Sequence, residues 1–132
     1  MLHVVSKIGK VNRTDEQIYT TLSDFNNLGR MLPPDKVQVW EATEDTCSFT
    51  IEKAGKISLR MIEKQPYKTI KVGSGEGVPM EFMLWIQLKQ IDPYKTAIRI
   101  TVKADANMMM RTMLKKPLQK GLDSMIDNLE KM

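Results

Sequence analysis

The sequence has almost none of the residues from which structural metal sites and nucleophilic triads are built. Its 132 residues include one histidine, His3, and one cysteine, Cys47. Structural zinc sites use several histidine or cysteine ligands at set spacings. A Ser-His-acid or Cys-His triad would have to use His3, which strand alternation turns outward. We therefore predict no catalytic triad, no metal site and no bound cofactor, and the single thiol excludes a disulfide within the chain.

Long apolar runs and clustered charge are also missing. No run approaches the ~18 residues of a membrane span, and the start, MLHVVSKIGKVNRTDEQ, lacks the basic and apolar blocks of a secretory signal. The net charge is +4, from 20 basic and 16 acidic residues, and the lysines are scattered instead of gathered on one face with aromatics. With one cysteine, this predicts a cytoplasmic protein that neither spans a membrane nor binds nucleic acid.

Two further chemical signals are weak. The glycine-rich stretch GSGEG at 73–77 is followed by a strand-like segment, whereas a phosphate-binding loop normally leads into the N-terminus of a helix. We therefore expect a flexible hairpin loop, for which glycines supply positive φ angles. Glu41 and Glu63 could act in acid–base chemistry only if their strands turned them inward, and surface positions are the simpler expectation.

The N-terminal part predicts a strand followed by two short helices. Residues 2–12 alternate as a strand that places Val4, Ser6 and Ile8 toward the core. Thr14 and Gln17 have the spacing of a capping box, which starts a helix with an apolar stripe. A second short helix is expected near 28–32, where the Pro33–Pro34 pair ends it.

The middle of the chain predicts an antiparallel meander. Six further strands are expected, near 37–43, 46–52, 57–65, 67–73, 79–91 and 95–105. The short links between them carry turn residues, and short links join antiparallel neighbours. In the strand at 79–91, Phe82, Leu84 and Ile86 share one face, which leaves Met83 and Trp85 on the other.

The register of the first hairpin in this meander depends on its turn. A two-residue turn at Glu44–Asp45 would pair Thr43 with Thr46, and hence Trp40 with Phe49. The interior would then be lined by Trp40, Ala42, Cys47, Phe49 and Ile51. A three-residue turn would instead bring Val37, Val39 and Glu41 inside, and Glu-Asp is not a strong signal for a two-residue hairpin turn.

The last 26 residues, 107–132, predict one long helix. Its apolar stripe, at steps of three and four, consists of Leu118, Leu122, Met125, Ile126 and Leu129. At about 1.5 Å per residue the helix is roughly 39 Å long, so its stripe needs a broad apolar surface such as a sheet. Pro117 predicts a kink or break near 113–117. The methionines at 108, 109, 110 and 113 are either core filler or a deformable ligand lining.

The order of one strand, two short helices, six strands and one long helix resembles the START-like, or SRPBCC, superfamily. The resemblance is carried by IYTTLSDFNNLGRMLP and KKPLQKGLDSMIDNL and covers essentially the whole chain. It implies a single α+β domain, 1–132, with the helix-grip fold of the birch pollen allergen. In that fold the long helix packs across a curved antiparallel sheet of about seven strands, and the first strand pairs with the last. Family members enclose an apolar cavity; some are polyketide cyclases or dehydratases, and others are co-chaperones.

The resemblance implies binding of a hydrophobic small molecule, of lipid, polyketide or quinone type, without covalent chemistry. A cyclase- or dehydratase-type enzyme and a protein-binding module are the alternatives. The cavity is expected between the sheet and residues 108–118, with its approach near Leu28 to Leu32. The predicted lining residues are Leu28, Leu32, Leu59, Met61, Ile70, Phe82, Leu84, Ile86, Ile98, Ile100, Met110, Met113 and Leu114.

The outer face of the sheet predicts a candidate homodimer interface. Met83 and Trp85 would lie side by side on an otherwise polar surface that none of the predicted helices covers. Aromatic and methionine side chains are enriched at protein interfaces. The alternative is an exposed apolar pair shielded by the aliphatic stems of Lys89 and Lys103.

Overall fold

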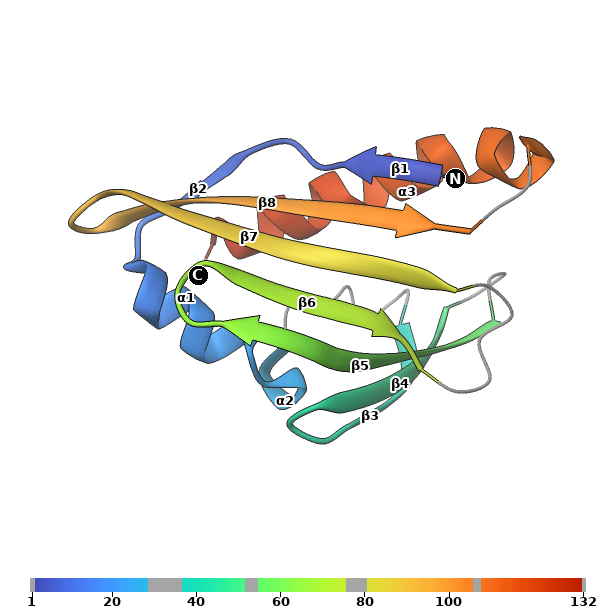
Figure 1. Cartoon of the computed structure of the whole chain (residues 1–132), viewed down its shortest axis with the longest axis horizontal. Helices are drawn as coiled ribbons and strands as arrows, with labels where there is room; N and C mark the ends of the chain where they lie inside the picture. The colour runs from blue at the N-terminus through green and yellow to red at the C-terminus, as the bar shows by residue number, and fades with distance from the viewer. Residues whose placement is uncertain (1, 29–36, 52–54, 76–80, 106–107, 132) are drawn as a thin grey trace.

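Eight strands and three helices make up the computed structural model, which describes residues 2–28, 37–51, 55–75, 81–105 and 108–131 (Figure 1). The elements in chain order are β1 (Leu2–Val5), β2 (Gly9–Val11), α1 (Asp15–Leu22), α2 (Phe25–Leu28), β3 (Val37–Ala42), β4 (Thr46–Ile51), β5 (Gly55–Gln65), β6 (Thr69–Ser74), β7 (Phe82–Asp92), β8 (Lys95–Ala104) and α3 (Met108–Leu129). The predicted stop at Pro33–Pro34 and the glycine-rich stretch beyond Gly75 lie outside the described residues.

All strands belong to one antiparallel sheet with the order β1-β8-β7-β6-β5-β4-β3, and β2 also pairs with β8. The predicted pairing of the first strand with the last is confirmed, because Leu2 opposes Ala104 and Val4 opposes Val102. α3 lies behind the sheet in Figure 1 and packs against β1, β2 and β8, whereas α1 packs against β6 and β7. The α+β helix-grip architecture predicted from the sequence is confirmed.

The predicted single strand at 2–12 is instead two strands, β1 and β2, separated by a bulge. Three residues, 6–8, separate Val5 from Gly9. Only two residues, 99 and 100, separate their pairing partners on β8, Thr101 and Ile98. The hydroxyl of Ser6 accepts a hydrogen bond from the Ile100 amide at 2.8 Å, and it thereby replaces a backbone carbonyl in the ladder. The extra residue inverts the alternation, so the expectation for Ile8 was wrong: its side chain is 65% exposed.

The inversion turns Gly9 toward α3. A Cβ atom at Gly9 would lie 2.4 Å from Cγ2 of Ile126, a fully buried residue of the helix. Only a residue without a side chain permits this close approach of helix and strand. Farther along the same edge, the Lys7 amide donates to Asp123 at 2.8 Å and the Lys10 amide donates to Glu130 at 3.0 Å.

Next to its turn, the hairpin between β3 and β4 has the register expected for a two-residue turn, and a bulge shifts the register between Gln38 and Glu41. The Thr43 amide donates to the Thr46 carbonyl at 2.8 Å, and Ala42 pairs with Cys47. The rings of Trp40 and Phe49 stack, with their centroids 5.4 Å apart. The inward placement of the first four predicted residues is confirmed, because Trp40, Ala42, Cys47 and Phe49 pack with the core; the side chain of Ile51 lies outside the described part.

α3 continues from Met108 to Leu129 through Pro117, so the predicted break does not occur. Its stripe is buried as expected at Leu122, Ile126 and Leu129. The wet side of the helix includes Pro117 and Gly121, and no described atom lies within 4 Å of a Cβ placed at Gly121. Pro117 is tolerated on this exposed side, where water can hydrogen-bond the carbonyl that loses its amide partner.

Candidate functional site

Strand register aligns two apolar rows across the concave face of the sheet. The first row runs from β3 to β1 through Ala42, Cys47, Leu59, Ser74, Phe82, Ala104 and Leu2. The second row runs from β5 to β1 through Met61, Val72, Leu84, Val102 and Val4. Both rows lie toward the end of the sheet where β8 finishes and α3 begins.

These rows are buried at one edge, and in the middle the buried residues Cys47 and Val72 alternate with half-buried ones. Leu2, Val4, Val102 and Ala104 lie on the strands beneath α3 and are at most 5% exposed. The side chains on β3, β5 and β7 pack against the core but remain half-buried. This half-covered set, which we call the concave hollow, consists of Trp40, Ala42, Leu59, Met61, Phe82 and Leu84.

Farther along the strands the concave face is closed. Ile70, Ile86, Ile98 and Ile100 are at most 2% exposed, because α1 and the C-terminal half of α3 cover this region. Burial therefore falls along the same sheet, from a packed core at one end to the concave hollow at the other. Apolar surface left uncovered on a concave face is where small-molecule sites are usually found.

The predicted lining residues fall partly in the concave hollow and partly in the packed core. Leu59, Met61, Phe82 and Leu84 lie in the concave hollow, whereas Ile70, Ile86, Ile98 and Ile100 form the packed core beside it. Met113 was wrongly placed, because it lies on the solvent side of α3 and is 66% exposed. The side chains of Leu28, Met110 and Leu114, and all of Leu32, lie outside the described residues.

Trp40 and Ala42 were missed as lining residues, although the two-residue turn at Glu44–Asp45 placed them inside. Leu118 and Met125 of α3 were also missed; both are half-buried and pack against the core. Their stripe position was visible in the sequence.

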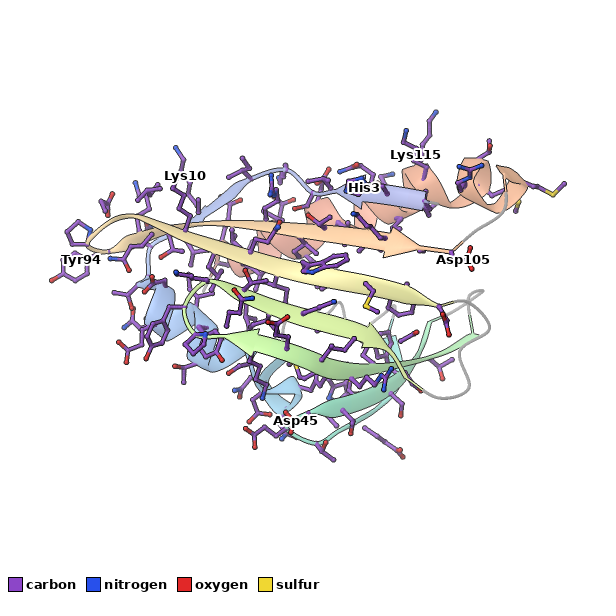
Figure 2. All side chains as sticks on the ribbon, in the orientation of Figure 1. His3, Lys10, Asp45, Tyr94, Asp105 and Lys115 are labelled. Atoms are coloured by element: carbon purple, nitrogen blue, oxygen red, sulfur yellow. The ribbon has the colours of Figure 1, made fainter. Side chains whose placement is uncertain are left out.

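Polar groups surround the open end of the concave hollow. A surface depression at this end reaches the concave residues Cys47, Leu59, Ser74 and Phe82 and passes Glu81 and Asp105. Figure 2 places Asp105 at the end of β8, and both acids are exposed. The larger part of the depression lies on the convex face, beside Met83, Trp85 and Lys103, and the continuous sheet separates it from the concave hollow.

Cys47 is the titratable side chain in the concave rows. Its thiol is 5% exposed, and burial raises its pKa to about 12. A thiol that stays protonated at neutral pH is a poor nucleophile. Glu41 and Glu63, the acids considered for acid–base chemistry, are both exposed. Within the described ranges, no three His, Cys, Asp or Glu side chains gather closely enough to hold a metal ion.

The convex face carries Met83 and Trp85, as alternation predicted. Met83 is exposed and Trp85 is half-buried. The ammonium groups of Lys71 and Lys103 lie 5.5 and 5.8 Å from the indole centroid, which is within the range of cation–π attraction. The predicted shielding by lysine therefore occurs, with Lys71 in place of Lys89. None of the helices within the described ranges combines the length and hydropathy of a membrane span.

Comparison with known proteins identifies the fold without a close relative. No protein-family model matches the sequence, and a search of curated proteins finds no match. Solved structures do match. A START superfamily protein from Mycobacterium smegmatis superposes with a TM-score of 0.77 at 14% identity, covering 98% of this chain and 94% of the other. The protein XoxI from Bacillus cereus gives 0.75 at 12% identity, with 99% and 94% covered.

A third similar structure is the di-domain ARO/CYC protein BexL. It matches with a TM-score of 0.77 at 12% identity, over 99% of this chain and 46% of BexL. This chain therefore spans about half of that protein. At these identities the likeness establishes the START-like helix-grip fold, and the activity has to be argued from the site.

Proposed function

We propose that the protein binds a hydrophobic small molecule, of lipid, polyketide or quinone type, in the concave hollow. The observation that carries the proposal is the half-covered state of Trp40, Leu59, Met61, Phe82 and Leu84 on a face whose other end is fully packed. Apolar side chains on a concave surface gain about 25 cal/mol for each Å² of apolar area that a ligand removes from water. The START-like fold of the similar structures supports the same proposal.

Binding without covalent chemistry fits the residues of the concave hollow better than catalysis does. An enzyme of the cyclase or dehydratase type would need acid or base groups directed at the ligand. Among the described residues at this end of the sheet, Glu81 and Asp105 are exposed, and the pKa of Cys47 is raised. Cytoplasmic location remains a prediction, supported by the single cysteine.

The test uses two neighbouring residues of β7 that point to opposite faces. Leu84→Trp fills the concave hollow, whereas Met83→Trp adds the same bulk to the convex face. We expect a neutral apolar dye, such as Nile red, to bind the wild type and Met83→Trp. Its affinity for Leu84→Trp should fall by about tenfold or more, while the melting temperature stays near that of the wild type.

Two results would contradict the proposal. The dye could fail to bind the wild type at all, or Leu84→Trp and Met83→Trp could bind it as well as the wild type does. A neutral dye is chosen because its binding reports the apolar surface alone, without any contribution from charge.

A further inference from the structure

Arg111 lies on the side of α3 that carries the apolar stripe, in line with residues that are buried or half-buried. It precedes Leu118 by seven residues, Leu122 by eleven and Leu129 by eighteen. At 3.6 residues per turn these spacings place all four side chains within roughly 20° of one direction. Burial agrees, because Arg111 is half-buried whereas its neighbours Thr112 and Met113 are exposed.

Among the described residues, the guanidinium of Arg111 has one nitrogen that lacks a hydrogen-bond partner. Its Nε is shielded from solvent and makes no hydrogen bond. The ion pairs of the described part of the chain join Lys7 to Asp127 and Lys64 to Glu44 and Asp45, and none involves Arg111. A buried donor without an acceptor is costly, and more so when it belongs to a charged group.

The position along α3 adds to this positive charge. Arg111 lies in the first turns of the helix, where the backbone amides give a partial positive charge. Natural helices usually place acidic residues there, but the first turn of α3 contains none. The charge of Arg111 and the partial charge of the helix amides therefore coincide at the N-terminal end of α3. Three residues, 105–107, separate this end from the last residue of β8.

This end of α3 adjoins the open end of the concave hollow. The row from Ala104 through Phe82 to Leu59 ends where β8 turns toward α3. Leu118, two turns after Arg111 on the same stripe, is half-buried against the core. Arg111 therefore lies at the same end of the sheet as the open end of the concave hollow. By contrast, Lys115 is exposed and points away from the sheet in Figure 2.

We infer that the ligand of the concave hollow is an amphipath whose anionic oxygens, such as a carboxylate, bind Arg111. Its apolar body then lies against Leu118, Leu84 and Phe82. An arginine fork matches the two oxygens of a carboxylate and forms charge-assisted hydrogen bonds. This assignment rests on the proposed function and narrows it to acidic ligands.

The test compares dodecanoic acid with dodecanol, which share a chain and differ in charge at about pH 8. Both compete with the neutral dye Nile red for the wild type, Arg111→Gln and Arg111→Lys. We expect the wild type to prefer the acid by about tenfold or more, the strength of one charge-assisted pair. Arg111→Gln should lose that preference without weakening dodecanol, and Arg111→Lys should keep part of it.

Lys115→Gln is the matched control, because it removes the same charge one turn away at an exposed position. It should leave the preference unchanged. The inference is overturned if the wild type binds acid and alcohol equally, or if Arg111→Gln and Lys115→Gln lower the preference by the same amount. Neither result affects the proposed function, which is tested by the binding of the neutral dye to the wild type and by the loss of that binding in Leu84→Trp.

Discussion

At the scale of single residues, Gly9 on β2 and Gly121 within α3 have opposite roles. Gly9 is buried against Ile126, and a Cβ there would clash at 2.4 Å. Gly121 lies on the wet side of α3 with no described atom near a Cβ. The close approach of helix and sheet therefore depends on Gly9 and not on Gly121. The bulge at Ser6 changes which residues face the helix, and a one-residue shift cannot be read from alternation alone.

We therefore predict opposite changes in stability for the same substitution. Gly121→Ala should raise the free energy of unfolding by about 1 kcal/mol, the helix propensity difference between the two residues. Gly9→Ala should lower it by about 2 kcal/mol, because the added methyl group overpacks the contact with Ile126. Urea unfolding of both variants measures this. Equal effects of the two substitutions would contradict the packing described for α3.

The buried thiol of Cys47 should make the free energy of unfolding depend on pH. Burial raises its pKa from 9.0 to about 12 in the folded protein. Below pH 9.0 the thiol is neutral in both states, so stability is unaffected. Above it the unfolded chain ionises first, and stability falls by about 1.4 kcal/mol per pH unit until about pH 12.

The difference between the wild type and Cys47→Ala isolates this contribution. Urea unfolding at about pH 8 and about pH 10.5 should show the wild type losing roughly 2 kcal/mol more than the variant. Parallel losses in the two proteins would show that the thiol is not buried as described.

At the scale of elements, local signals were the most predictable. Thr14 caps α1 with φ −73° and ψ 158°, and it exchanges hydrogen bonds with Gln17 as the capping box predicted. The predicted order of the strands matches the observed order because short links join antiparallel neighbours. The division of the first strand was missed, since the Ser6–Ile100 hydrogen bonds join residues that are distant in the sequence.

The cap of α1 gives a further prediction. Thr14→Ala removes the acceptor of the Gln17 amide, a bond of 3.1 Å. We expect the free energy of unfolding to fall by about 1 kcal/mol. Thr14→Ser keeps the hydroxyl and is the control, so thermal unfolding should place it near the wild type. A loss as large for serine as for alanine would mean that the hydroxyl does not cap the helix.

At the scale of the whole molecule, the sequence could identify which residues face inward but not how completely they are covered. Leu59 and Ile70 were both predicted to line a cavity, yet only Leu59 is half-covered. Coverage depends on where α1 and α3 lie over the sheet, and that follows from many long-range contacts. The position of Arg111 follows from its spacing to Leu118 and Leu122, but the lack of an acceptor for its Nε among the described residues is a property of the fold.

Homodimerisation through Met83 and Trp85 remains a prediction of the sequence. In a two-fold interface Lys71 and Lys103 would lie close to Lys71 and Lys103 of the second copy. These like charges repel, so we expect weak association that strengthens when salt screens them. Sedimentation velocity at tens of micromolar should show a dimer for the wild type at high salt and a monomer for Trp85→Glu. A dimer that persists in Trp85→Glu would exclude this interface.

Native mass spectrometry tests the central claim, that the concave hollow holds an apolar small molecule, most directly. The protein is purified without detergent, exposed to a lipid extract and sprayed under non-denaturing conditions. We predict an added non-covalent mass on the wild type and Met83→Trp that is absent from Leu84→Trp and is lost on denaturation. A wild type that carries no added mass, or a Leu84→Trp variant that carries the same mass, would contradict the account.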